Sequence, residues 1–284
     1  MMLAMVFLNS SRALASIKRI NEVLDTVIDL TDEKAKEKGA VVERGAVEFS
    51  HVDFRYYKDS PEWVLQDISL KILPGQTVGI IGPTGCGKTS LVSLIPRLYD
   101  VDHGAVLVDG IDVREYSLRH LRDGVGMVLQ KNVLFSGDIM ENLRWGDPNA
   151  TDEQVREAAG HAQADAFVQS FPDGYGTELG QGGSNVSGGQ KQRLCIARAL
   201  LKKPRILILD DSTSAVDTAT EAKIREAFQT TLCQTTKIII AQRISSVMEA
   251  DQIFVMEAGR IVGRGTHEEL MKTCREYREI YDSQ

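Results

Sequence analysis

The sequence predicts an α/β fold built on a mainly parallel β-sheet. Short, continuous apolar runs, such as residues 78–81 and 206–209, alternate along the chain with segments of helical periodicity. Such runs are typical of central parallel strands, which are buried on both faces, and the alternation is typical of βαβ units. The third observation is a glycine-rich loop at residues 82–89, between one such run and a helical segment.

Length and composition are those of an ordinary globular chain. Its 284 residues allow one large or two modest domains, with 43% hydrophobic and 26% charged residues. The net charge of −7 provides no global basic field, so we expect no nucleic-acid partner. No C-x-x-C spacing occurs, and we expect reduced, unpaired thiols. The cysteines are Cys86, Cys195, Cys233 and Cys274.

The N-terminal region is predicted to be helical and then charged. Residues 1–8 are apolar, and residues 10–30 have the apolar spacing of an amphipathic helix. We interpret this helix as the tail of a membrane helix, with a plain surface helix as the alternative. A secretory signal is disfavoured because the basic n-region is missing. The charged residues 32–39 predict a linker and a domain boundary near residue 40.

The first half of the remaining chain predicts strands around the glycine-rich loop. Apolar residues alternate from Val47 to Phe54 with a one-residue slip, which predicts a strand carrying a bulge. Asp109-Gly110 predicts a tight turn after a strand. The other predicted elements are strands at 64–72, 78–81 and 105–108 and a helix at 90–98.

The second half predicts helices first and then alternating strands and helices. Residues 137–185 have a mostly helical pattern interrupted by Gly- and Asn-rich loops. The predicted helices are 139–143, 153–162, 164–171, 191–201, 221–228 and 267–281. The predicted strands are 125–129, 206–209 and 237–241, followed by a hairpin of 253–256 and 260–265.

The glycine-rich loop fits the pattern G-x-x-x-x-G-K-[ST], which binds the phosphates of a nucleotide. Glycines let backbone N–H groups close around an anion, and the following helix adds its positive dipole end. Lys88 is predicted to neutralise phosphate oxygens, and the Thr89 hydroxyl to hold Mg²⁺. The predicted nucleotide-binding residues of this region are Gly82, Pro83, Thr84, Gly85, Cys86, Gly87, Lys88, Thr89 and Ser90.

Polar side chains follow four of the buried apolar runs. Gln130, the pair Asp210 and Asp211, and Gln242 each come directly after such a run, as does Gly82. In open α/β sheets the ligand site lies at the carboxyl ends of the strands. The sequence therefore predicts that these groups meet at one nucleotide site.

A resemblance to the ABC ATPases rests on the signature segment, residues 186–190 (Val-Ser-Gly-Gly-Gln), followed by Lys-Gln-Arg. With the loop, Gln130, the Asp210 strand and Ser214-Ala215-Val216-Asp217 in order, it covers about residues 45–275. The runs 134–137, 141–144, 171–175 and 265–270 resemble the exporter subfamily of multidrug and lipid half-transporters. Residues 16–20 are similar to the segment that joins the last membrane helix to the nucleotide-binding domain there.

The resemblance implies a P-loop NTPase fold with a RecA-like parallel sheet core. It also implies an antiparallel β subdomain, at about 45–75 and 104–110, and an inserted α-helical subdomain at about 137–190. Residues 1–40 would be the end of the last transmembrane helix and a linker, and residues 41–284 the nucleotide-binding domain.

The resemblance also assigns roles to single residues. Tyr56 would stack on adenine, with Tyr57 or a purely structural tyrosine as alternatives. Gln130 would approach Mg²⁺, Asp210 would hold it through water, and Asp217 would belong to the nucleotide site. The residues implied to bind the γ-phosphate of ATP held by a second subunit are Ser187, Gly188, Gly189 and Gln190. Each ATP would thus be sandwiched in a dimer.

The chain departs from the family pattern at three places. Asp211 stands where the family usually has the glutamate that polarises the attacking water, and Gln242 where it has histidine. Residues 181–183 are Gln-Gly-Gly, where exporters commonly have Glu-Arg-Gly. Each change alone could be neutral, but both catalytic positions change while the ATP-binding motifs stay intact. We therefore predict ATP binding with slow hydrolysis by Asp211, Gln242 and Gln130, and a different, competent partner chain.

The leading interpretation is the ATPase subunit of an exporter on the cytoplasmic face of the cell membrane. It would use ATP and Mg²⁺ and act with a transmembrane domain on a small molecule or lipid. One alternative is a regulatory subunit that clamps ATP without useful hydrolysis. Another is a soluble, non-transport ABC ATPase, which the exporter-like runs and the apolar residues 1–8 disfavour.

Overall fold

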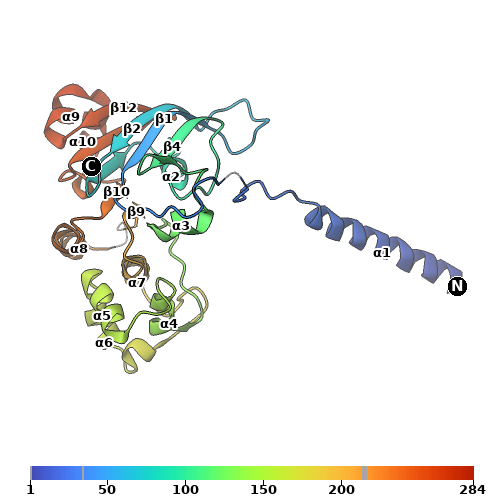
Figure 1. The fold of residues 1–284 in the computed structure, drawn as a ribbon. Coiled ribbons are helices and arrows are strands. Elements are labelled where there is room, and N and C mark those ends of the chain that lie inside the picture. The colour runs from blue at the N-terminus through green and yellow to red at the C-terminus, as the bar shows by residue number, and fades with distance from the viewer. Residues whose placement is uncertain (1, 34, 213–215) are drawn as a thin grey trace.

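The computed structural model describes residues 2–33, 35–212 and 216–284. Ser214 and Ala215, the first half of the segment predicted to end at Asp217, lie outside these ranges. Figure 1 shows β-sheets and helices gathered in one body, from which the N-terminal helix projects.

A six-stranded sheet forms the centre of the body, in the order β12-β11-β3-β10-β9-β6. Neighbouring strands from β11 to β6 run parallel, and only β12 is antiparallel to its neighbour. The strands are β3 (Thr77–Ile81), β6 (Val125–Val128), β9 (Ile206–Asp210), β10 (Thr236–Ile240), β11 (Gln252–Glu257) and β12 (Arg260–Gly265). The predicted parallel core and C-terminal hairpin are confirmed.

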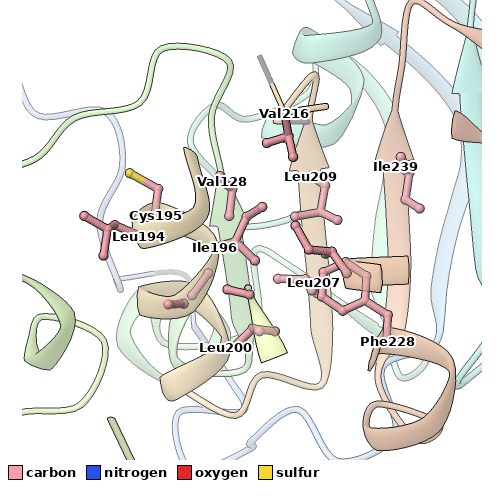
Figure 2. Close-up of a cluster of buried hydrophobic side chains, with 14 of the residues drawn as sticks. Val128, Leu194, Cys195, Ile196, Leu200, Leu207, Leu209, Val216, Phe228 and Ile239 are labelled. Atoms are coloured by element: carbon pink, nitrogen blue, oxygen red, sulfur yellow. The ribbon is translucent and has the colours of Figure 1, made fainter. Parts of the chain in front are cut away.

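Alternate residues of the central strands supply two different hydrophobic cores. Leu207 and Leu209 of β9 belong to a cluster with the helices, and Figure 2 shows Ile196 of α7 (Gly188–Leu201) among them. Ile206 and Ile208 belong to a second cluster with the antiparallel sheet. Every residue of β9 and β10 is buried because both faces of the sheet are covered.

The second sheet is antiparallel and has the order β2-β1-β4-β5. Its strands are β1 (Val47–Phe54), β2 (Leu65–Ile72), β4 (His103–Val108) and β5 (Ile111–Asp112). The predicted bulge is confirmed by the register shift after Phe49, where His51 has a φ of 47°. The predicted turn is also confirmed, since Asp109 and Gly110 both have positive φ between paired strands.

Most helices cover the face of the central sheet that β9 presents through Leu207 and Leu209. In Figure 1, α4, α5 and α6 gather around α7 at one end of the molecule. They are α4 (Ile139–Arg144), α5 (Asp152–His161) and α6 (Asp165–Gln169). The later helices are α8 (Thr218–Thr231), η2 (Ile244–Ser246), α9 (His267–Thr273) and α10 (Arg275–Asp282).

Several predicted helices have different limits in the structure, and α7 and α8 each begin three residues earlier than predicted. Helix α2 (Lys88–Ser93) ends before residue 98 because Pro96 disfavours helical geometry at the residue before it. Helix α1 (Met2–Leu24) ends before residue 30, at a stretch rich in β-branched residues. The predicted C-terminal helix is two helices, since Cys274 between them is extended, with φ −111° and ψ 117°.

Some short elements were not predicted. Helix α3 (Leu118–Asp123) is capped by the Ser117 side chain, which accepts from the backbone N–H of His120. Within the region predicted to be helical, β7 (Gly137–Asp138) and β8 (Glu178–Leu179) pair, and η1 (Gly174–Gly176) lies between α6 and β8. Two-residue strands leave no periodic pattern, so the sequence cannot reveal them.

Apolar side chains of helix α1 between Met5 and Leu24 are exposed where the structure describes them. Phe7 is 75% exposed and Val23 is 74% exposed. Among the helices of the described ranges, none is both long and apolar enough to span a membrane.

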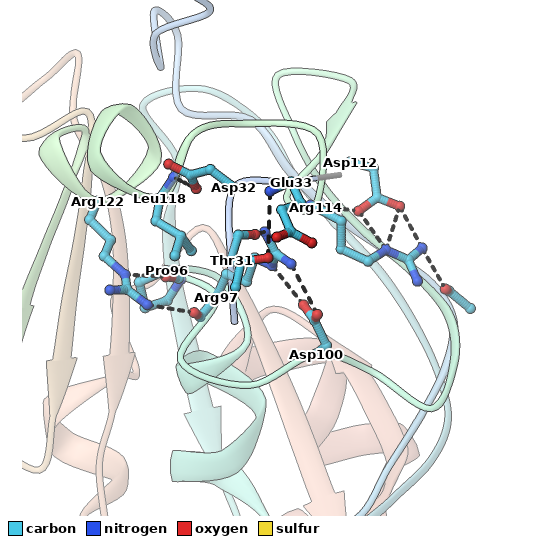
Figure 3. A network of polar contacts seen from close by, with 11 residues as sticks. Thr31, Asp32, Glu33, Pro96, Arg97, Asp100, Asp112, Arg114, Leu118 and Arg122 are labelled. Carbon is cyan, nitrogen blue, oxygen red and sulfur yellow. Dashed lines mark hydrogen bonds and ion pairs between the residues drawn. The ribbon is translucent and has the colours of Figure 1, made fainter. Parts of the chain in front are cut away.

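The linker after α1 is fastened to the body next to α2, as Figure 3 shows. Arg97, which is 1% exposed, binds both carboxylate oxygens of Asp100 at 2.7 and 3.0 Å and the carbonyl of Thr31 at 3.4 Å. Asp32 accepts from the backbone N–H of Leu118 at 2.8 Å. These contacts place the linker against the segment that follows the glycine-rich loop and its helix.

Candidate nucleotide-binding site

The four predicted strand ends lie at one edge of the central sheet. Strands β6, β9, β10 and β3 are consecutive neighbours and parallel. Gln130, Asp211, Gln242 and Gly82 follow these strands, so the expected meeting of strand ends is present. Direct hydrogen bonds join three of them.

Asp211 is the centre of this contact. Its Oδ2 accepts from Gln242 Nε2 at 2.8 Å and from Gln130 Nε2 at 3.3 Å. Its backbone N–H donates to the carbonyl of Ile240 at 2.9 Å, and its φ is 47°. Aspartate is among the residues that tolerate this left-handed conformation, because its short polar side chain can form local hydrogen bonds.

Both carboxylates of the site are partly withdrawn from water. Burial raises the pKa of Asp211, while hydrogen bonds from Gln130 and Gln242 oppose the rise. Burial also raises the pKa of Asp210, with the charge of Asp211 adding to it and the Thr89 hydroxyl opposing it. Asp210 is 2% exposed and its Oδ2 has no hydrogen-bond partner. A buried, unpartnered carboxylate oxygen beside a threonine hydroxyl fits a hydrated Mg²⁺ ion.

The glycine-rich loop is closed around the ammonium of Lys88. Its Nζ donates to the carbonyls of Gly82 and Pro83, at 2.7 and 2.8 Å, and lies 3.8 Å from Cys86 Sγ. A Cβ at Gly82 would lie 2.1 Å from the carbonyl oxygen of Met256, so only glycine fits between β3 and β11 there. Lys88 is therefore held beside the backbone N–H groups that would face a phosphate.

Tyr56 lies next to this loop. Its hydroxyl is 2.7 Å from Ser90 Oγ, and its ring makes edge contacts with Phe54 and Tyr99, each at 5.0 Å. The side chain remains 45% exposed, whereas Tyr57 is 78% exposed. Of the two candidate tyrosines, Tyr56 is the one that is fixed beside the loop.

The signature segment begins helix α7. Ser187 Oγ accepts from the Gln190 backbone N–H at 3.3 Å, and Gln190 Oε1 accepts from the Ser187 N–H at 2.9 Å, which forms a capping box. Ser187 and Gly188 are exposed, and Gly189 is half-buried. Helix α7 packs in the core on one face of the central sheet and α2 in the core on the other. The two hydrogen bonds between Ser187 and Gln190 lie within the signature segment and do not reach the glycine-rich loop.

Asp217 has a structural contact that the sequence analysis missed. Its carboxylate caps α8 by accepting from the Thr220 backbone N–H at 3.0 Å. These hydrogen bonds lower the pKa of Asp217, which is exposed. An aspartate directly before the first residue of a helix is a known capping signal, so the sequence could have revealed this role.

Two further residues near the site were also missed. Ser212 follows Asp211, is 2% exposed, and its hydroxyl has no hydrogen-bond partner. Gln284 binds the backbone of the loop after β10 through its side chain. Nothing local in the sequence indicates the burial of Ser212 or the contacts of Gln284.

The glycine-rich loop and the mostly parallel sheet covered by helices define a P-loop NTPase fold. In this chain a separate antiparallel sheet lies beside it. More narrowly, the chain belongs to the ABC transporter family, whose model, described as "ABC transporter", matches residues 65–214. The predicted family and fold class are thereby confirmed.

Curated relatives match nearly the whole length of this chain. The multidrug export ATP-binding/permease protein YgaD of Bacillus subtilis (strain 168) is 47% identical over 274 residues, which cover 96% of this chain and 47% of that protein. The ABC transporter ATP-binding protein YfiB of the same organism is 46% identical over 284 residues, covering 99% of this chain and 48% of that protein. The chain thus spans about half the length of the curated relatives it matches.

A solved structure also matches over the whole chain. It is described as a bacterial Atm1-family ABC exporter with ATP bound, and it is 35% identical with a TM-score of 0.91. The match covers 100% of this chain and 49% of that chain.

Proposed function

We propose that this chain is the ATP-binding part of an ABC exporter subunit that holds MgATP at its own site and hydrolyses it slowly there. Its signature segment would complete the active site of a different, competent partner. The observation that carries the proposal is the pair of amide donors on one oxygen of Asp211.

The amide donors bear directly on hydrolysis. A general base must accept a proton from the attacking water. Here Asp211 accepts instead from Gln130 and Gln242, and aspartate is one methylene shorter than the usual glutamate. A misplacement of about 1 Å can cost on the order of 10²-fold in rate. Gln242 can donate to a γ-phosphate but cannot take up a proton or carry charge.

Binding of MgATP rests on other residues. Lys88 would neutralise phosphate charge, and Thr89 and the unpartnered oxygen of Asp210 would hold Mg²⁺. The ion supplies charge neutralisation at the phosphates when bound. Tyr56, fixed beside Ser90, would stack on adenine. Asp217 would contribute to the nucleotide site from its position at the start of α8.

The second half of the proposal concerns partners. Ser187 and Gly188 are exposed at the N-terminus of a 14-residue helix, a position that favours an anion. In a dimer this segment would face ATP on the second subunit. The exposed apolar residues of α1 support a junction with a transmembrane domain, so residues 1–40 would leave the membrane and residues 41–284 would lie at its cytoplasmic face. The transported substrate would be a small molecule or lipid.

The test uses the full-length subunit with its partner, purified together. The double variant Asp211→Glu with Gln242→His should raise turnover at this chain's own site by about 100-fold, as measured by per-site nucleotide trapping with a photoreactive ATP. Gln229→His, the same substitution on the exposed surface of α8, is the matched control and should change nothing. Equal wild-type turnover at both sites would sink the proposal.

The regulatory clamp remains a second candidate, because Asp211 is already engaged by both amides. Under this alternative, Asp211→Asn leaves the ATPase rate of the complex and transport unchanged. Under the slow-motor proposal, the same variant removes the residual turnover at this site while ATP binding persists.

A further inference from the structure

The side chain of Gln284 fastens the loop that carries Gln242. Gln284 Nε2 donates to the Gln242 carbonyl at 2.6 Å, and the Ile244 backbone N–H donates to Gln284 Oε1 at 2.8 Å. The loop follows β10 directly, where the parallel ladder with β3 and β9 has ended. One carboxamide thus satisfies two backbone groups of the loop.

The chemistry of a primary amide suits this contact. It offers an acceptor and a donor on neighbouring atoms, as a peptide group does. The C=O of one residue and the N–H of the residue two positions later point to the same side of an extended chain. Gln284 therefore substitutes for a neighbouring strand at Gln242 and Ile244, whose groups would otherwise have to bond to water.

Helix α10 holds the amide in place. Tyr277 of this helix is fully buried, and its hydroxyl lies 2.9 Å from His267 Nδ1. Tyr277 shares one hydrophobic cluster with Ile244, so the helix and the loop pack on the same core. The Gln284 backbone N–H then donates to the Tyr281 carbonyl at 3.3 Å, which sets the direction of the last residue.

The fastened loop is the one that delivers Gln242 to the catalytic carboxylate. Gln242 Nε2 donates to Asp211 Oδ2 at 2.8 Å. A continuous set of hydrogen bonds thus runs from Gln284 through the loop backbone and the Gln242 side chain to Asp211. The two residues at its ends are 73 positions apart in the sequence (284 − 211).

We propose that Gln284 is a positioning residue that holds the backbone of Gln242 so that its amide stays directed at Asp211 and at the γ-phosphate of bound ATP. The proposal rests on the proposed function, which places ATP at this site. Loss of the Gln284 amide lets the loop move and weakens occlusion of ATP, but it leaves the contacts of the glycine-rich loop in place. A substitution of Gln284 should therefore weaken the occlusion of ATP while leaving the affinity for ATP nearly unchanged.

The experiment uses the full-length subunit in complex with its partner. Two quantities are measured at this chain's site: the Kd for a fluorescent ATP analogue, and the half-life of radiolabelled ATP retained after rapid removal of free nucleotide. We expect Gln284→Ala to leave the Kd within about twofold and to shorten the half-life about tenfold, as the loss of two neutral hydrogen bonds allows. Ser283→Ala, the matched control, should behave as wild type because its hydroxyl donates to the Ile280 carbonyl of α10.

Two further variants separate positioning from packing. Gln284→Glu keeps the size of the side chain but replaces the donor with a carboxylate that faces the Gln242 carbonyl, so it should shorten the half-life as much as Gln284→Ala does. In a Gln242→Ala background, Gln284→Ala should have no further effect on the half-life, because the residue acts through the Gln242 side chain.

Wild-type retention in Gln284→Glu, or additive effects of Gln284→Ala and Gln242→Ala, would overturn the proposal. An equal rise in Kd and loss of retention would overturn it too, since that is the result of general loosening. Failure of the proposed function has a different result: fast wild-type turnover at this site. In that case the Gln284 effect would still be measured, as a fall in kcat at unchanged KM.

Discussion

Asp109 provides a direct test of how the antiparallel sheet is fastened beside the nucleotide site. Its Oδ2 accepts from the backbone N–H groups of Glu43 and Arg44, at 2.8 and 2.9 Å, and its Oδ1 from that of Ala46 at 2.8 Å. Asp109 itself has a φ of 51° in the turn between β4 and β5. One carboxylate thus ties the entry of β1 to the neighbouring hairpin.

The cost of Asp109→Ala follows from these contacts. A hydrogen bond to a charged group contributes about 1.5–3 kcal/mol when buried, and less when exposed. Two of the three bonds are exposed, so we expect a total loss of about 2–4 kcal/mol, including the left-handed φ that alanine tolerates poorly. Asp109→Asn keeps one acceptor oxygen and the tolerance for positive φ, and it should lose about half as much.

The pH dependence of the free energy of unfolding shows whether the charge of Asp109 stabilises the folded protein. Burial alone would raise the pKa of Asp109, but hydrogen bonds from the backbone of residues 43–46 together lower it below the ordinary value of 3.8. A depressed folded-state pKa means that the carboxylate stabilises the protein fully above about pH 4–5 and stops doing so as the pH falls through the folded-state pKa. The difference between wild type and Asp109→Asn should therefore be constant near neutrality and shrink on acidification.

Urea unfolding, followed by far-UV circular dichroism from pH 7 down to pH 3.5, measures these differences. Asp59→Ala, which removes an exposed carboxylate in a loop, should stay within about 0.5 kcal/mol of wild type. The reasoning is refuted if Asp109→Asn matches wild type at pH 7, or if the difference grows as the pH falls.

Two further predictions concern the nucleotide site. Gly82→Ala should lower the free energy of unfolding of the nucleotide-free protein in urea by about 3 kcal/mol, because its Cβ would lie 2.1 Å from the Met256 carbonyl oxygen. Gly85→Ala, whose Cβ would have no atom within 4 Å, should cost only about 1–2 kcal/mol for its positive φ. Equal costs for the two variants would contradict the close approach at Gly82. Tyr56→Phe should keep the affinity for a fluorescent ATP analogue within about threefold, while Tyr56→Ala should lower it about tenfold, since stacking on a base contributes about 1–3 kcal/mol; equal affinities for the two variants would count against adenine stacking.

The elements that the sequence predicted well are those with a strong local pattern. Continuous apolar runs predicted β9 and β10, which are buried at every residue. The Asp109-Gly110 turn and the bulge near His51 were also predicted correctly. Helix limits were predicted less well, because α2 and the C-terminal helices end where a single residue, near Pro96 or at Cys274, interrupts a favourable pattern.

The residues of the nucleotide site also differ in how far the sequence predicts them. The sequence by itself determined the glycine-rich loop, the carboxylates after β9 and the signature segment before α7, because each is a run of adjacent residues with its own chemistry. From parallel strand order it also predicted that Gln130, Asp211 and Gln242 meet at one edge.

Only the tertiary structure decided how those residues meet. The two amides that share one oxygen of Asp211 come from positions 81 and 31 residues away along the chain, and Gln284 binds Gln242 across 42 residues. Such contacts depend on the register of neighbouring strands and on the direction in which α10 ends, and no local spacing encodes either. The physical reason is range: periodicity and turn chemistry act over a few residues, whereas the geometry around Asp211 is set by side chains that only the folded sheet brings together.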